Sequence, residues 1–140
     1  MSDLDVKDLG ALTKAADESG LARLMGLELA AVGDGYAEAY LTVTEEHTNF
    51  FGMTHGAILY ALADHAGSVA GNSLSRRAIM SQSTAYFFGN PAVGTRLTAK
   101  ARVTQAGRSL GMMEVEVTDP DGRRLLSFNA GMYFIDKEPA

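Results

Sequence analysis

Cysteine is absent from the 140-residue chain, which excludes disulfides, thiol nucleophiles, thiolate zinc sites and iron–sulfur clusters. Histidine is scarce: His47, His55 and His65 are the only three, and their spacing fits no short metal-binding motif. Proline occurs only three times and no low-complexity tract is present, so we expect no linker between domains. The sequence therefore predicts one domain over residues 1–140, with no metal or other cofactor.

The sequence also has few basic residues and no long uninterrupted apolar run. Lys and Arg number 12 against 17 Asp and Glu, and the net charge of −5 disfavours a nucleic-acid partner, which requires a basic face. The longest apolar stretch, residues 57–70, is interrupted by Asp64 and His65 and is too short to span a bilayer. The charged N-terminus does not resemble a signal peptide. We therefore expect a cytoplasmic protein with no membrane partner.

What is present is the composition of an ordinary globular protein, with 46% hydrophobic and 21% charged residues. Apolar residues near helical spacing predict one or two short helices within residues 5–25, separated at Gly20, and a long helix over about 55–74. A hairpin is predicted over 27–43, with its turn at Gly33-Asp34-Gly35, and residues 45–54 are predicted to form a loop. Four further strands are predicted over residues 78–88, 95–105, 110–118 and 123–135.

Two of these four strands, at residues 97–103 and 113–117, alternate strictly between apolar and polar side chains. Such alternation indicates a sheet with one buried and one wet face. Because repeated β-α-β units are missing, the element order favours an α+β fold in which an antiparallel sheet packs against one main helix.

The long helix presents two different faces on a helical wheel. One face is a continuous apolar arc, which is wide enough to be buried on the sheet; it consists of Ile58, Leu59, Leu62, Ala63, Ala66, Val69 and Ala70. Asp64 lies opposite, among small residues that include Gly67 and Gly71, each unfavourable within a helix by about 1 kcal/mol. Small residues allow a ligand or another backbone to approach. Asp64 is therefore either a solvated or capping carboxylate or one that lines a site.

The start of this helix carries a second candidate group. The first amides of a helix have no intrahelical partner, and the amide of Gly56 is not shielded by a side chain. Such an amide suits a developing oxyanion. Alternatively, Gly56 is an ordinary first helical residue and His55 an ordinary cap.

Gly56 and Asp64 lie eight residues apart, which is about 12 Å along a helix. Groups that act on one carbonyl must each approach it to about 3 Å, so the two residues of one chain cannot share a substrate. Two antiparallel copies of the helix would bring Gly56 of one chain near Asp64 of the other. The spacing therefore predicts an obligate homodimer with two shared sites, if both residues act on the same bond.

The chain resembles the hotdog-fold acyl-CoA thioesterases, in particular the phenylacetate-pathway branch. The likeness rests on the pattern Asn-x-x-Gly-x-x-His-Gly followed by a carboxylate, here formed by Asn49, Gly52, His55, Gly56 and Asp64. It extends over nearly the whole chain, including residues 24–27 and the late hairpin around residues 107–111. The resemblance implies a sheet wrapped around a central helix, and homodimers that often pair into homotetramers.

The resemblance also implies hydrolysis of acyl-CoA thioesters. It assigns Asp64 as the catalytic carboxylate and Gly56 as the oxyanion amide, while Asn49 and His55 orient the site and the substrate carbonyl. The sequence leaves open whether Asp64 attacks directly or activates water. Phe50, Phe51 and Tyr60 suggest an aromatic or medium-sized apolar acyl group, without identifying it.

The chain departs from the family pattern at three places. Ala57 replaces the second glycine after His55, and Tyr86 begins a segment in which an arginine is missing at Gly89. A phosphate contact at position 89 is therefore in doubt. Arg108, in the predicted late hairpin, becomes the candidate for binding the coenzyme A moiety, although an arginine there is by default a solvated charge.

Three other functions fit the sequence less well. Residues 107–111 fit the Gly-x-Ser-x-Gly pattern of α/β-hydrolases, but that motif joins a strand to a helix and here a strand follows. A hydratase or dehydratase acting on acyl thioesters would pair an Asp with a His, whereas the adjacent Asp64 and His65 diverge by about 100° on a helix. A non-catalytic acyl-CoA-binding protein would not need Asp64.

Overall fold

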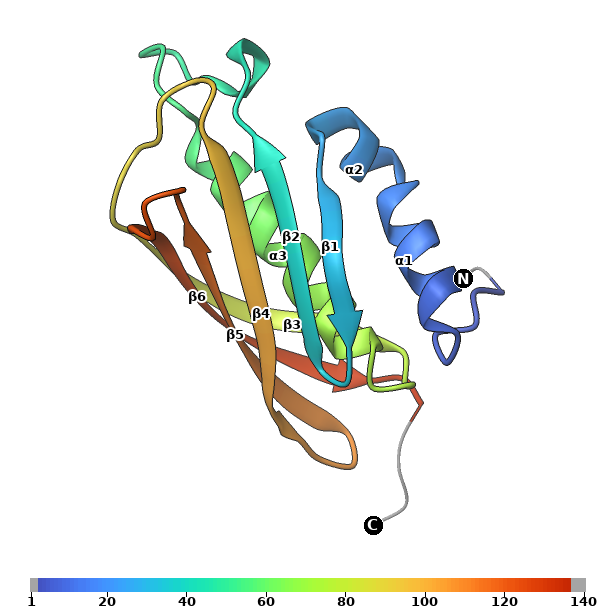
Figure 1. Cartoon of the computed structure of the whole chain (residues 1–140). Helices are drawn as coiled ribbons and strands as arrows, with labels where there is room; N and C mark the ends of the chain where they lie inside the picture. The colour runs from blue at the N-terminus through green and yellow to red at the C-terminus, as the bar shows by residue number, and fades with distance from the viewer. Residues whose placement is uncertain (1–2, 137–140) are drawn as a thin grey trace.

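Six antiparallel strands form one sheet, and a long helix, α3 (Gly56–Asn72), lies against it in a computed structural model that describes residues 3–136 (Figure 1). The strands follow the order β1-β2-β4-β5-β6-β3, so β1 and β3 are the two edges. The predicted α+β class is confirmed. The strands are β1 (Glu28–Gly33), β2 (Tyr36–Thr42), β3 (Ala78–Phe87), β4 (Arg96–Ala106), β5 (Leu110–Thr118) and β6 (Arg124–Phe134).

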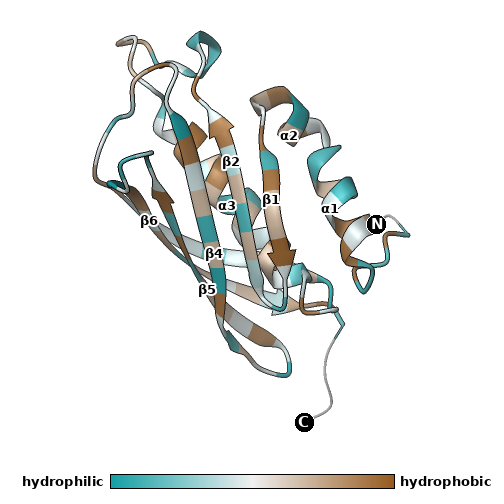
Figure 2. Cartoon of the chain, in the orientation of Figure 1, coloured by the Kyte–Doolittle hydropathy of each residue, from teal (hydrophilic) through white to brown (hydrophobic). Residues whose placement is uncertain are grey.

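Alternation along the strands gives the sheet a buried face toward α3 and a polar outer face. In β5, every second residue from Gly111 to Val117 is buried, and Figure 2 shows similar alternation as teal and brown bands along β4. The predicted turn between β1 and β2 has positive φ at both Asp34 and Gly35, 45° and 80°. Two such residues form a type I′ turn, whose twist matches that of the flanking strands.

The predicted N-terminal helical segment consists of α1 (Leu9–Asp17) and α2 (Gly20–Met25), which lie beside β1 in Figure 1. Asp8 caps α1, because its carboxylate accepts a hydrogen bond from the Ala11 amide at 3.0 Å. The break between the helices lies before Gly20, which is the first residue of α2 rather than the separator that was predicted. Gly26 ends α2 with a φ of 75°, a left-handed conformation that glycine adopts without strain.

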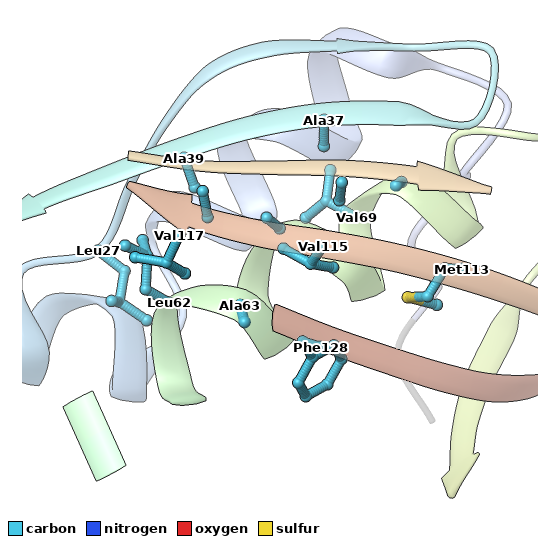
Figure 3. Close-up of a cluster of buried hydrophobic side chains, with 14 of the residues drawn as sticks. Leu27, Ala37, Ala39, Leu62, Ala63, Val69, Met113, Val115, Val117 and Phe128 are labelled. Atoms are coloured by element: carbon cyan, nitrogen blue, oxygen red, sulfur yellow. The ribbon is translucent and has the colours of Figure 1, made fainter. Parts of the chain in front are cut away.

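The buried face of α3 matches the predicted apolar arc, and all seven of its residues are buried. Figure 3 shows three of them, Leu62, Ala63 and Val69, among side chains of β2, β5 and β6. This burial of apolar surface is what holds the helix on the sheet. No helix in the described part of the chain is long and apolar enough to cross a membrane.

Gly67 and Gly71, the two glycines in the second half of α3, serve the contact with the sheet. A Cβ at Gly67 would lie 2.5 Å from Sδ of Met113, and one at Gly71 would lie 2.7 Å from Sδ of Met132. The expectation that these glycines leave room for a ligand or another backbone is therefore wrong. They admit the methionine side chains of β5 and β6, because the curved sheet covers more of the helix than the predicted arc.

Candidate active site

The first turn of α3 leaves one backbone amide available. The His55 imidazole accepts a hydrogen bond through Nδ1 from the Ala57 amide at 3.0 Å, and the His55 carbonyl accepts from the Ile58 amide. Within residues 3–136, no hydrogen bond is recorded for the Gly56 amide. A free N–H at the positive end of a helix dipole is a donor for an anionic or carbonyl oxygen.

Gly56 is glycine because the ring of Phe87 covers it. A Cβ at position 56 would lie 3.3 Å from Cε1 of Phe87, which is tighter than ordinary contact. The loop after β3 is joined to the loop before α3, since Asn90 both donates to the Thr54 carbonyl and accepts from the Thr54 amide. Thr54 also donates its hydroxyl to the Pro91 carbonyl at 2.6 Å. No sequence pattern predicts this clamp between Thr54 and the loop after β3.

The side chain of Asn49 organises the loop that leads into α3. Its Oδ1 accepts hydrogen bonds from the amides of Phe51, at 2.9 Å, and Met53, at 3.1 Å. The sequence did not single out His47, which is buried and whose carbonyl accepts from the His55 amide at 2.8 Å. The structure thus places His55 and Asn49 around the start of α3, as the cap of the helix and the centre of the preceding turn.

Asp64 lies two turns along the same helix and faces the edge strand β3. It lines a cavity of about 330 Å³ together with Tyr60 of α3 and residues 80–83 of β3. Burial raises the pKa of the Asp64 carboxyl above its ordinary value, and the neighbouring His65 opposes this only in part. Among the described residues, no hydrogen bond to the carboxylate is recorded. A half-buried carboxylate with a raised pKa is better suited to accept a proton than an exposed one.

His65 points away from this cavity, toward α1. Its Nε2 is buried without a hydrogen bond and lies 3.7 Å from a carboxylate oxygen of Asp17. Burial lowers the pKa of His65, while Asp17 opposes the shift. Asp64 and His65 thus diverge as the sequence predicts, and they form no acid–base dyad.

Two of the hydroxyl groups that line the cavity, those of Tyr60 and Ser83, form a contact that the sequence did not predict. The hydroxyls of Tyr60 and Ser83 are 2.5 Å apart, within hydrogen-bond distance. Their meeting depends on how β3 lies along α3, because they are 23 residues apart in the chain. Local sequence patterns hold no signal for such a long-range pair.

Arg108 lies in the turn between β4 and β5, at a groove of about 650 Å³. The turn joins two strands, so the rejection of a nucleophile elbow at Ser109 is confirmed. The groove includes the apolar residues Leu110 and Met112, and it shares Ser81 and Gln82 with the Asp64 cavity.

The guanidinium group of Arg123 lies beside Gly89, where the family pattern has an arginine. A Cβ at Gly89 would lie 3.2 Å from Nη2 of Arg123, which comes from the turn between β5 and β6. Arg108 and Arg123 are thus both exposed arginines in turns between strands. Within residues 3–136, no group of three or more His, Asp or Glu side chains could hold a metal ion.

Comparisons with known proteins identify the family of the chain. The model of the thioesterase superfamily matches residues 51–126, which include α3 and the cavity. The acyl-coenzyme A thioesterase PaaI of Escherichia coli (strain K12) is 29% identical over 112 residues, 80% of each chain. The 1,4-dihydroxy-2-naphthoyl-CoA hydrolase of Listeria monocytogenes serotype 1/2a is 32% identical over 103 residues, 71% of this chain and 83% of that protein.

The fold is shared as well. The solved structure of the E. coli PaaI protein from the phenylacetic acid degradation operon superimposes with a TM-score of 0.87 and 26% identity. The match covers 96% of this chain and 98% of that one. Since the family match also spans more than half of the sequence, the chain has the hotdog fold, belongs to the thioesterase superfamily and is a thioester hydrolase.

Proposed function

We propose that the protein hydrolyses acyl-CoA thioesters to a carboxylic acid and free coenzyme A. The observation that carries this proposal is the pairing of two groups on α3: the available Gly56 amide and the half-buried Asp64 carboxylate beside a polar cavity. The names of two relatives, an acyl-coenzyme A thioesterase and a naphthoyl-CoA hydrolase, support coenzyme A thioesters as the substrate class.

In the proposed mechanism, the Gly56 N–H donates a hydrogen bond to the thioester carbonyl oxygen. Asp64 removes a proton from a water molecule, whose oxygen attacks the carbonyl carbon and forms a tetrahedral oxyanion. Collapse of this intermediate breaks the carbon–sulfur bond, and the thiolate leaves and takes up a proton. The polar cavity favours this role for Asp64 over direct attack, because it offers room for water next to the carboxylate. No cofactor is needed for any of these steps.

The two groups come from different subunits in this proposal. Gly56 and Asp64 are the first and ninth residues of one rigid helix, about 12 Å apart along its axis, so a single chain cannot apply both to one carbonyl. A homodimer is therefore the smallest active unit.

The edge strand β3 offers the surface for this dimer. Phe88 donates its amide to the Leu125 carbonyl of β6, so by alternation the amides of Ser83, Ala85 and Phe87 point to the free edge. In an antiparallel pairing of two β3 strands centred on Ala85, Phe87 of one chain lies opposite Ser83 of the other. Phe87 covers Gly56 and Ser83 lines the Asp64 cavity, so this register unites the two halves of the site.

The activity is tested by following release of the coenzyme A thiol with a colorimetric thiol reagent, across short, medium, branched and aromatic acyl-CoAs. The absence of cysteine from the chain removes any background reaction of the protein itself. Hydrolysis of at least one class is expected. Hydration of an enoyl-CoA without thiol release, or binding without turnover across the whole panel, would contradict the proposal.

The coenzyme A moiety is proposed to lie along the groove that ends at Arg108. The shared residues Ser81 and Gln82 connect this groove to the Asp64 cavity, and a guanidinium at its end suits a phosphate. Arg108→Ala is expected to raise KM about three- to ten-fold and to leave kcat unchanged, because it removes binding that is uniform along the reaction. The effect is expected to be larger at low salt.

Arg123→Ala is the matched control for this prediction, since Arg123 is also an exposed arginine in a turn between two strands. The same steady-state kinetics are measured for both variants at two ionic strengths. An increase in KM for Arg123→Ala alone would place the phosphates at Gly89 and would contradict the assignment of Arg108.

A further inference from the structure

Tyr60 is fixed at both ends of its side chain. Its ring meets the ring of Phe128 edge-on, with centroids 5.2 Å apart, and its hydroxyl lies 2.5 Å from that of Ser83. One turn of α3 separates Tyr60 from Asp64, so both project from the helix toward β3 and line the same cavity. A phenylalanine would fill the same ring position, so packing against Phe128 does not account for the hydroxyl.

The Tyr60–Ser83 bond leaves Ser83 able to bind a water molecule. A serine hydroxyl has one hydrogen and two lone pairs. If Tyr60 donates, one lone pair of Ser83 Oγ remains; if Ser83 donates, both remain. In either sense of the bond, Ser83 Oγ can accept a hydrogen from a further donor in the cavity.

Asp64 and Ser83 line this cavity together, yet no direct hydrogen bond between them is recorded among the described residues. Two polar groups that line one cavity without a direct hydrogen bond are commonly bridged by water. A water that donates one hydrogen to Asp64 and the other to Ser83 keeps a lone pair free. That lone pair is the one that must attack the thioester carbonyl carbon.

We propose that Tyr60 is a positioning residue for hydrolysis: through its hydrogen bond it holds Ser83 Oγ in the orientation that binds the attacking water beside Asp64. This inference rests on the proposed function. The water loses one proton to Asp64, forms the new carbon–oxygen bond and ends in the carboxylic acid product. In this proposal Tyr60 acts on the water through Ser83.

The test compares Tyr60→Phe, Ser83→Ala and the double variant with the wild-type chain in steady-state acyl-CoA hydrolysis. Tyr60→Phe is expected to lower kcat about five- to ten-fold, the value of one hydrogen bond, and to change KM less than about two-fold. Ser83→Ala is expected to lower kcat at least as much. In the Ser83→Ala background, Tyr60→Phe is expected to have no further effect, because the group it positions is gone.

Tyr133→Phe is the matched control, because Tyr133 is an exposed tyrosine on β6 outside the cavity. Thermal unfolding of each variant shows whether the fold is retained. A purely structural role predicts a lower Tm with unchanged kcat. Wild-type kcat in Tyr60→Phe, or additive losses in the double variant, would overturn the role of Tyr60. Absence of hydrolysis by the wild-type chain would instead overturn the proposed function.

Discussion

Replacing Asp64 by asparagine is expected to lower kcat for acyl-CoA hydrolysis about a thousand-fold, because the change removes the proposed general base at nearly constant shape. Among the residues that line the cavity, Asp64 is the one carboxylate, so the substitution leaves no second acidic side chain there to replace it. Steady-state kinetics measured by thiol release give the result directly. KM is expected to change little, since Asp64 acts on the water rather than on the bound thioester.

The same substitution is expected to stabilise the protein at neutral pH. Burial raises the pKa of Asp64 in the folded chain, so the folded state holds this proton more tightly than the unfolded state. Stability is therefore lost as pH rises from the usual aspartate range through the raised pKa. Asp64→Asn abolishes this loss, so its Tm is expected to exceed that of the wild type at pH 7 and to match it in acid.

The activity of the wild-type protein is expected to depend on the same raised pKa of Asp64. Activity requires the ionised carboxylate, so kcat/KM is expected to rise through a pKa above that of an ordinary aspartate. Asp121→Asn, in the exposed turn between β5 and β6, is the matched control and is expected to retain activity. Substantial turnover by a folded Asp64→Asn protein would contradict the assignment of Asp64.

Local patterns were sufficient to predict the elements of this fold. The buried arc of α3, the alternation of β4 and β5 and the turn at Asp34–Gly35 each reflect interactions between residues close in the chain. Gly56 and Asp64 could be identified as candidate groups from the sequence for the same reason, because helical geometry alone relates their positions. Their separation along the helix also led to the hypothesis of a second subunit.

Features that depend on strands meeting the helix could not be predicted. Gly67 and Gly71 were assigned to an open face because a helical wheel does not show how far the sheet curls around it. The hydrogen bond from Tyr60 to Ser83 and the clamp of Asn90 on Thr54 join residues 23 and 36 positions apart. Such pairs are set by strand order and register, for which a single sequence offers only the turn signals.

Loss of the proposed dimer is the second large effect that we expect. Ala85→Pro is expected to yield a folded monomer whose kcat/KM is lower by at least about a hundred-fold. A monomer cannot bring Gly56 of one chain and Asp64 of another to the same substrate. The amide of Ala85 points away from β6 by the alternation described above, so proline removes no bond within the sheet. It does remove a donor at the centre of the proposed β3–β3 pairing. Sedimentation velocity and thiol-release kinetics measure the two consequences together.

A cysteine pair tests the register of this dimer independently of activity. With Ala85 at the two-fold axis, Thr84 lies opposite Tyr86 of the other chain as a non-hydrogen-bonded pair, with Cα atoms about 4.5 Å apart. This distance is within the range that a disulfide spans. The doubly substituted Thr84→Cys, Tyr86→Cys chain is therefore expected to form a covalent dimer on oxidation, visible on a non-reducing gel.

The control for this pair is a chain with Gln82→Cys and Tyr86→Cys, which would be cross-linked only if the axis passed through Thr84. Because the natural chain has no cysteine, any covalent dimer must arise from the introduced residues. Cross-linking of the control in preference to the Thr84–Tyr86 pair would shift the register. An active species of monomer mass, or a fully active Ala85→Pro monomer, would contradict a site shared between two chains and would require Gly56 and Asp64 to act on different parts of the substrate.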